Sequence, residues 1–350
     1  MTLTARHYGL DDPFVREVAT AAASVFAAPG FLQALAATLA AEQRAELFLI
    51  GVSDGVGRPV ALFPFTSRVV GRLHRIEGIG LGVADYYTPV LAREADREEL
   101  WRAVRTALPP ADILHLINVP GSLFGRTHGL ESAGFLAPMG HASTVLPLIE
   151  DGRPIDPAKF SAAKDVRRKQ KKLAALGPVS FALAKTPEQK AELFDALVRF
   201  RDQRFSKLGR ADKLHEPGVS AFYRQLLEQG TAEIFGLKVG DEVVAVVYGF
   251  VHEGVFTLII PTMTADPKFE PGSPGLVSMY LTIEACIARG DRVFDFSVGA
   301  LHYKTRFGAE KHDLFEHVEA RSLLGLPAAW ITQVRSMVRT RRVAKQALAT

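Results

Sequence analysis

The chain has 350 residues, of which 48% are hydrophobic and 23% are charged, so it can bury a large core and is too long for one ordinary domain. Its one cysteine, Cys286, excludes an intramolecular disulfide and fits a cytoplasmic protein. The net charge of +4 is concentrated: residues 321–350 hold six cations and no acid, and KDVRRKQKK at 164–172 holds six cations and one acid, which excludes a protein that is basic throughout.

The first half opens with an alanine-rich stretch, residues 18–41, that carries no charge. Pro29 and Gly30 would break a membrane-spanning helix, and acidic residues precede the stretch where a signal peptide has cations. We therefore expect two packed helices joined by a turn, with neither a signal peptide nor a transmembrane segment.

The rest of the first half alternates between extended and helical patterns. Residues 46–80 predict a strand, an Asp-Gly turn, a second strand and a third extended run. Residues 93–108 have the apolar spacing of a helix. Further strands are expected from DILHLINVP and STVLPLIE, before the linker at 151–160.

The second half predicts helices, an antiparallel meander, a Gly/Pro-rich loop, a helix and a strand, which together indicate a mixed α/β sheet. The basic segment 161–176 is the first of these helices and ends at Gly177–Pro178. The other expected elements are a strand at 179–184, helices at 187–205 and 218–230, the meander strands 232–239, 242–251 and 254–262, a helix at 275–289 and a strand at 292–297.

The second half resembles a known family, most clearly in its last part. The segment SPGLVSMYLTIEACIARGDRVFDFSVGALHYKTRFG, residues 273–308, resembles the signature of the acetyltransferase-like domain of CelD-type (cellulose-biosynthesis-associated) proteins of the GNAT superfamily. VRRKQKKLAALGPVSF and LKVGDEVVAVVYGFVHEGVFTLIIPTM are similar to its earlier parts, so the resemblance spans about 161–310. Phe205 stands where the family usually has tryptophan.

The resemblance implies an α/β (α+β mixed sheet) fold of two tandem GNAT-like domains, as in the related FemAB-type transferases. We expect an N-terminal domain at 1–150 that frames the acceptor, a C-terminal acetyltransferase domain at 151–325 and a basic helix at 326–350. In such a fold two neighbouring strands, here 255–262 and 292–297, separate after a shared start and admit an acyl-CoA.

The resemblance also implies where the acyl-CoA binds. A loop that leads into a helix N-terminus suits a pyrophosphate, so Gly272, Ser273, Gly275 and Leu276 are the expected cofactor-binding residues. The alternative is that Ser273–Pro274 only starts a helix, because proline is favourable at the first helical position. No metal-binding pattern is present in the sequence, and no metal is expected.

Three residues are the expected catalytic groups. Asp295 orients or deprotonates an acceptor amine, or alternatively holds the turn before Gly299. Tyr303 is the candidate acid toward the leaving thiolate. His252, in a hairpin turn, is a candidate base, as is His302, although surface histidines are common.

Other residues are expected to bind the acceptor. Lys304 can hold an anionic group, and Arg167 and Arg168 can grip a phosphate. Asp85 and Tyr86 are expected to face the acceptor from the first half.

The sequence thus predicts an N-acetyltransferase or related acyltransferase that uses acetyl-CoA or another acyl-CoA and acts on an amine or hydroxyl of a small polar acceptor, such as a cell-envelope or polysaccharide precursor. Two alternatives stay open: aminoacyl transfer from a charged tRNA, and a non-catalytic scaffold of envelope-polysaccharide assembly. A nucleic-acid partner, a tRNA, is expected only if the protein is an aminoacyl transferase. The basic C-terminus either rests on a membrane surface or packs its apolar residues on the protein.

Overall fold

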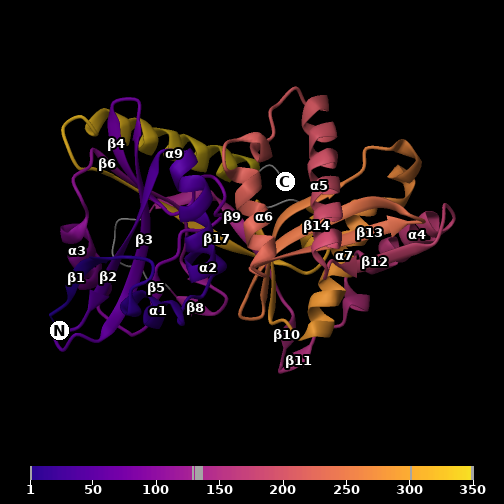
Figure 1. Cartoon of the computed structure of the whole chain (residues 1–350), viewed down its shortest axis with the longest axis horizontal. Helices are drawn as coiled ribbons and strands as arrows, with labels where there is room; N and C mark the ends of the chain where they lie inside the picture. The colour runs from indigo at the N-terminus through magenta and orange to yellow at the C-terminus, as the bar shows by residue number, and fades with distance from the viewer. Residues whose placement is uncertain (1, 128–129, 131–136, 300–301, 348–350) are drawn as a thin grey trace. The chain divides into compact units, whose positions relative to one another are not determined.

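The computed structural model describes residues 2–127, 130, 137–299 and 302–347 (Figure 1). It divides into two compact units. Unit 1 comprises the chain up to Ser143 together with the part from His312 onward, and unit 2 comprises Thr144–Lys311. The functional division at residues 150 and 325 expected from the sequence stays a prediction.

Unit 1 is built on a sheet in which the strand order is β1-β2-β3-β4-β6-β17, with β9 next to β17. These strands are β1 (Thr4–Tyr8), β2 (Ala45–Ser53), β3 (Pro59–Val70), β4 (Leu73–Gly78), β6 (Ile113–Pro120), β17 (Glu310–Ala320) and β9 (Ala137–Pro147), with the short β5 (Val90–Leu91), β7 (Ser122–Leu123) and β8 (Arg126–Thr127). The helical segments are α1 (Pro13–Ala19), η1 (Val25–Ala27), α2 (Pro29–Leu35), its π-helical continuation η2 (Ala36–Ala40), α3 (Arg97–Ala107) and α9 (Leu326–Ala347).

Unit 2 has the strand order β9-β16-β15-β14-β13-β12, in which β9 contributes its last residues. Its strands are β12 (Val179–Leu183), β13 (Ala232–Val239), β14 (Glu242–His252), β15 (Val255–Met263) and β16 (Val293–Val298), with the hairpin β10 (Ile149–Glu150) and β11 (Arg153–Pro154). Its helical segments are η4 (Pro157–Lys159), α4 (Ala163–Ala174), α5 (Pro187–Lys207), η5 (Lys213–His215), α6 (Val219–Glu228), η6 (Pro267–Gly272), α7 (Pro274–Arg289) and α8 (His302–Thr305).

The two units repeat one arrangement of strands. In unit 1 the antiparallel meander β2-β3-β4 is followed by α3 and by β6, which pairs parallel to β4. In unit 2 the meander β13-β14-β15 is followed by α7 and by β16, which pairs parallel to β15. The helix–meander–helix–strand order predicted for both halves is confirmed.

The core of unit 2 lies on both faces of its sheet because side chains alternate along each strand. From β14, Tyr248 points toward the aromatic residues of α5 and α6, with its ring 6.3 Å from that of Phe194 and its hydroxyl donating to the carbonyl of Tyr223. The neighbouring Val247 belongs to the opposite cluster, together with Ile283 of α7.

Two described strands of five or more residues were not predicted from the sequence. The first is β1, and the second is β17, which is rich in charged residues and therefore does not look like a buried strand. In β17, Leu314 and Glu316 are nevertheless buried where the strand pairs with β6. Among the described residues, no helix is long and apolar enough to cross a membrane.

Candidate functional site

A fork between β15 and β16 is the central feature of unit 2. The two strands pair only over three positions, and the last pair is Thr257 with Asp295. Beyond it, β15 continues to Met263 and β16 continues to Val298. Within the described residues β15 has β14 and β16 as its only sheet neighbours, so its backbone beyond Thr257 faces no strand on the β16 side. The separation predicted for these strands is observed.

An extra residue bends β15 where it leaves β16. Tyr248 pairs with Ile260 and Gly249 pairs with Leu258, so Ile259 is a bulge two residues after Thr257. A Cβ at Gly249 would lie 2.3 Å from the Phe256 ring, which explains the glycine opposite the bend. Pro261 follows within β15, and proline occurs in strands that have an unpaired side. Pro261 is therefore a signal in the sequence itself that one side of β15 is unpaired, and the fork was predicted without it.

Asp295 lies at the base of the fork and is fully buried. Its Oδ1 accepts a hydrogen bond from the backbone N–H of Ser297, 2.8 Å away. Ser297 has a φ of +61°, a conformation that non-glycine residues adopt at a cost. One carboxylate oxygen therefore holds the strained end of β16, while the catalytic role of Asp295 stays a prediction.

Lys304 reaches back from α8 to the same strand end. Its side chain is buried, and its Nζ donates to the carbonyl of Phe296 at 2.8 Å and to that of Gly299 at 2.6 Å. Longer contacts of 3.4 Å reach the carbonyls of Ser297 and Val298. The ammonium group thus caps the backbone where β16 ends. Acceptor binding by Lys304 stays a prediction.

Tyr303 precedes Lys304 on α8 and packs partly against the core of unit 2. Burial disfavours the phenolate and raises the pKa of Tyr303, although the positive charge of Arg204 on α5 opposes the shift. The hydroxyl is therefore protonated at neutral pH and able to donate a proton. Arg204 was not among the site residues predicted from the sequence.

His252 lies at the closed end of the fork. It is the last residue of β14 and pairs with Val255, from which β15 runs past the last β15–β16 pair toward Met263. A base at this position would stand behind the paired part of the strands and not in the open part. The side chain of His302 lies outside the described residues.

The loop that enters α7 combines close packing with a helix N-terminus. A Cβ at Gly272 would lie 2.3 Å from Cδ2 of Leu173, so this glycine allows η6 to pack on α4. Ser273 has a φ of +42°, and its carbonyl accepts from the N–H groups of Leu276 and Val277. Leu276 also packs against the core.

Gly275 is the residue of this loop that best fits a phosphate contact. It lies in the first turn of α7, where backbone N–H groups have no intrahelical acceptor. A Cβ there would meet Sδ of Met263 at 3.1 Å, so the glycine keeps the backbone accessible beside the end of β15. The Gly275 N–H and the hydroxyl of Ser273 can therefore receive an anionic group at this helix end.

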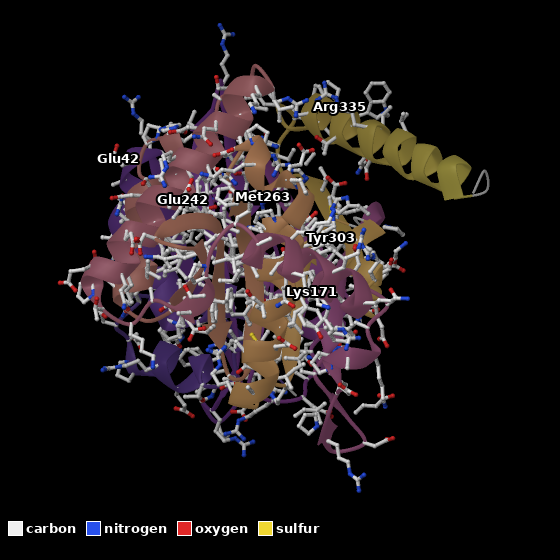
Figure 2. The ribbon with its side chains drawn as sticks, turned by 90° about the vertical axis from the view of Figure 1, so that its right-hand side faces the viewer. Glu42, Lys171, Glu242, Met263, Tyr303 and Arg335 are labelled. Atoms are coloured by element: carbon white, nitrogen blue, oxygen red, sulfur yellow. The ribbon has the colours of Figure 1, made fainter. Side chains whose placement is uncertain are left out.

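Helix α4 contacts both the segment after α8 and the loop that enters α7. Near its start, Asp165 binds Arg306 at 3.1 Å, just after α8, and near its end Leu173 packs on Gly272. Asp165 also binds Arg168 at 2.7 Å, and hydrogen bonds from Arg168 and Arg306 lower the pKa of Asp165. Arg168 is thus partly neutralised, whereas Arg167 is exposed, as are the lysines of the last turn (Figure 2, Lys171).

A hollow of about 580 Å³ opens beyond the end of β15. It is lined from α5 by Arg199, Gln203 and Lys207, and from the loop after β15 by Thr264 and Asp266. Volumes of this size accommodate a small ligand. Because Thr264 follows Met263 directly, the hollow lies at the open end of the strand.

In unit 1 the two residues expected to face the acceptor, Asp85 and Tyr86, differ in burial. Tyr86 is buried, with its ring 5.7 Å from that of Phe26, whereas Asp85 is half-buried. Their role toward an acceptor stays a prediction.

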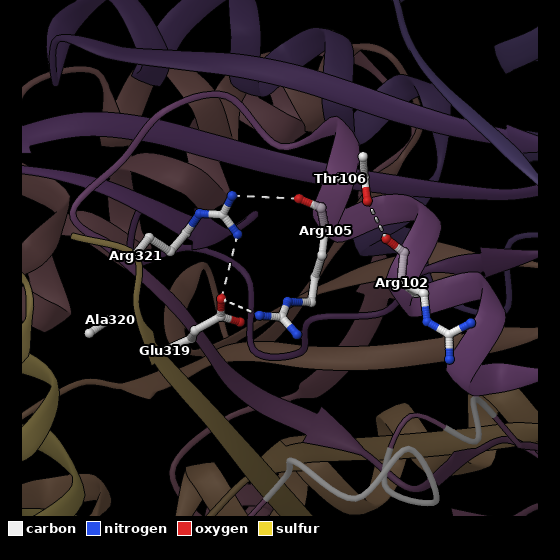
Figure 3. A pocket seen from close by; sticks show the side chains of 6 residues that line it. All are labelled: Arg102, Arg105, Thr106, Glu319, Ala320 and Arg321. Atoms are coloured by element: carbon white, nitrogen blue, oxygen red, sulfur yellow. Dashed lines mark hydrogen bonds and ion pairs between the residues drawn. The ribbon is translucent and has the colours of Figure 1, made fainter.

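Unit 1 also contains a hollow of about 430 Å³ between α3 and β17 (Figure 3). Glu319 there binds Arg105 at 2.7 Å and Arg321 at 3.6 Å. Burial alone would raise the pKa of Glu319, but hydrogen bonds from His317 and Arg105 lower it. The carboxylate therefore neutralises much of the positive charge of this hollow. The hollow is for this reason a weaker anion site than its arginines suggest.

Residues 161–305 match the family model of the acetyltransferase (GNAT) domain. No curated protein matches the chain.

Several solved structures share the fold. The C-terminal domain of a protein assigned as a lysylphosphatidylglycerol synthetase from Agrobacterium fabrum has a TM-score of 0.57 and 12% identity over 91% of this chain and 93% of that one. FemX has a TM-score of 0.55 and 10% identity over 84% of this chain and 92% of that one. L-PGS from Bacillus licheniformis has a TM-score of 0.50 and 12% identity over 83% and 87%. Residues 161–305 are thus similar to the acetyltransferase (GNAT) domain, in a chain with a mixed α/β, tandem GNAT-like fold.

Proposed function

We propose that unit 2 transfers an acyl group from an acyl-CoA to the amine or hydroxyl of a small polar acceptor. The observation that carries this proposal is the fork: β15 and β16 separate after Thr257 and Asp295, and the far end of β15, at Met263, lies beside the N-terminus of α7. The β15 backbone beyond Thr257 suits an extended chain such as pantetheine, and the helix end at Gly275 suits its phosphates.

Acyl transfer to an amine requires loss of a proton from the acceptor and protonation of the leaving thiolate. The thioester supplies an activated carbonyl, and the protein supplies positioning and proton transfer. Tyr303 fits the role of acid because its raised pKa keeps the phenol protonated at neutral pH. Asp295 fits the role of orienting the acceptor, because its carboxylate lies at the base of the fork. His252 fits less well, since it lies at the closed end.

The hollow beyond β15 is our proposed acceptor site. Its lining carries both signs of charge, with Arg199 and Lys207 from α5 and Glu242 and Asp266 from the sheet side. A zwitterionic or polyhydroxylated acceptor would match such a lining better than an apolar one. A cell-envelope or polysaccharide precursor, as in CelD-type proteins, is our candidate, and a cytoplasmic location stays a prediction.

Aminoacyl transfer from a charged tRNA is the second candidate. The exposed cations of α4 favour it, because Arg167, Lys171 and Lys172 lie on a helix that packs against the loop entering α7. A protein assigned as a lysylphosphatidylglycerol synthetase also shares the fold. Binding through these cations would be sequence-independent and would weaken steeply with salt.

Calorimetric titration with acetyl-CoA and with a long-chain acyl-CoA tests the first candidate. The Gly275→Trp variant should lose binding because its indole fills the space beside Met263 and covers the helix end. Leu208→Trp is the matched control, because Leu208 is 57% exposed at the end of α5 in the same unit. Equal binding by wild type and Gly275→Trp would contradict the placement.

A complete absence of acyl-CoA binding would overturn the acyl-CoA proposal and direct the search to charged tRNA. Salt-sensitive tRNA binding that Arg167→Glu abolishes would then support aminoacyl transfer. If neither ligand binds, a scaffold role in envelope-polysaccharide assembly becomes the preferred explanation.

A further inference from the structure

The C-terminal helix α9 presents its large apolar side chains to solvent. Trp330 is 66% exposed, and Leu326 is 53% exposed. Spacings of four residues place Leu326, Trp330, Val334 and Val338 along one side of the helix, and Ile331 is adjacent. Leu323 and Leu324, directly before the helix, are 84% and 70% exposed. We call these seven residues the apolar stripe.

The opposite side of α9 carries small and polar residues and faces unit 1. Ala329 and Ser336 are buried, and Thr332 is half-buried. Gln333 donates to the carbonyl of Val318 in β17 at 3.4 Å. An ordinary surface helix buries its large apolar residues and exposes its polar ones. In α9 this pattern is reversed, so the stripe is suited to an external partner.

The charge around the stripe indicates the nature of that partner. Residues 321–350 contain six cations and no acid, and Arg335 is exposed on α9 itself (Figure 2). A second copy of the chain, joined through the same surface, would bring together two helices that each carry five cations and no acid. An anionic bilayer offers apolar depth to the stripe and negative charge to the cations. Tryptophan also prefers the membrane–water interface.

We infer that α9 is an amphipathic helix that attaches the protein to the surface of anionic membranes, with Trp330 and Ile331 inserted below the headgroups. The helix lies in the plane of the interface and does not span the bilayer, in agreement with its charge. This attachment is independent of the acyl-transfer chemistry proposed for unit 2. It would hold the enzyme where a lipid-linked acceptor is found.

Cosedimentation of the full chain with vesicles tests the inference. We expect binding to equimolar phosphatidylcholine and phosphatidylglycerol, and little binding to phosphatidylcholine alone. The Trp330→Gln/Ile331→Gln variant should bind the anionic vesicles about tenfold more weakly, because two inserted side chains are lost. Val56→Gln/Val69→Gln is the matched control, since these residues are 76% and 69% exposed on unit 1 outside the stripe.

Tryptophan fluorescence gives a second readout from the same samples. The protein has two tryptophans, and Trp101 is 3% exposed whereas Trp330 is 66% exposed. Anionic vesicles should therefore shift the emission of Trp330 to the blue, and Trp330→Phe should bind without the shift. Circular dichroism checks that each variant is folded.

Three results would overturn the inference. The first is that the wild type does not sediment with anionic vesicles, and the second is that both double variants lose binding equally. The third is a dimer, measured by light scattering, that the Trp330→Gln/Ile331→Gln variant converts to a monomer. That result would assign the stripe to a second copy of the chain.

Discussion

Gly272 and Leu173 are in direct contact, and no side chain fits between them. A Cβ on Gly272 would lie 2.3 Å from Cδ2 and 2.6 Å from Cγ of Leu173. Through this contact the basic helix α4 is fixed against the loop that leads into α7. The close approach at Gly272 therefore helps to hold the cations of α4 beside the proposed phosphate site.

Replacement of Gly272 by alanine should displace α4 from this loop. Overpacking of a buried contact usually costs about 1–3 kcal/mol of unfolding free energy, and we expect a loss in this range. Acyl-CoA binding should weaken as well, because Gly275 lies three residues later. Chemical denaturation and calorimetry measure the two effects. Gly9→Ala, at a position with open space around it and no positive φ, controls for the loss of a glycine, and an unchanged Gly272→Ala protein would contradict the packing argument.

Replacement of Lys304 by methionine should destabilise unit 2. The ammonium group donates to several carbonyls at the end of β16, and each buried acceptor left without a donor costs about 1–3 kcal/mol. We expect a total loss of about 3 kcal/mol in denaturant unfolding. Lys185→Met, at an exposed lysine, should have little effect. If Lys304→Met has native stability but fails to bind an acceptor, the residue acts in binding and not as a cap.

Replacement of Tyr303 by phenylalanine tests the proposed acid. General acid catalysis contributes about 10²–10⁴-fold, so kcat should fall by at least about 100-fold while the protein stays folded. The raised pKa of Tyr303 means that the wild-type kcat should decline only above pH 10, as the phenol loses its proton. The variant should lack this alkaline decline. Tyr280→Phe, on α7, is the control, and an unchanged kcat in Tyr303→Phe would exclude the tyrosine as the acid.

Replacement of Asp212 by asparagine tests a structural ion pair. Asp212 is 4% exposed and binds Nε of Arg201 at 2.6 Å. Burial alone would raise the pKa of Asp212, but the hydrogen bond and charge of Arg201 outweigh it and lower the pKa. The pair therefore stabilises the fold above the ordinary aspartate pKa of about 3.9, and this contribution is lost as the pH falls through the lowered value.

At neutral pH we expect Asp212→Asn to lower the free energy of unfolding by about 2 kcal/mol, as for a hydrogen bond between charged groups. The difference from wild type should shrink as the pH falls below the ordinary aspartate pKa and through the lowered value, where wild-type Asp212 also loses its charge. Urea unfolding of both proteins, from neutral to acidic pH, measures this difference in the free energy of unfolding. A difference that is independent of pH would show that the charge of Asp212 contributes nothing.

The sequence predicted most elements of unit 2 and their order, because apolar periodicity and turn residues are local properties. The meander, the loop with Gly272 and Gly275 and the helix that follows were expected within a few residues of their observed bounds. The strand β17 was missed because its burial depends on pairing with β6, almost two hundred residues earlier, and not on its own composition.

The sequence also determined which residue types gather near residues 295–304, but their partners depend on the tertiary structure. The sequence predicted that Lys304 holds an anionic group, and only the return of α8 to β16 directs its ammonium to backbone carbonyls. The tail likewise showed apolar residues beside arginines, and only its packing on unit 1 decided which side of α9 faces solvent. In both cases the local pattern allows several arrangements, and the packing of distant segments selects one of them.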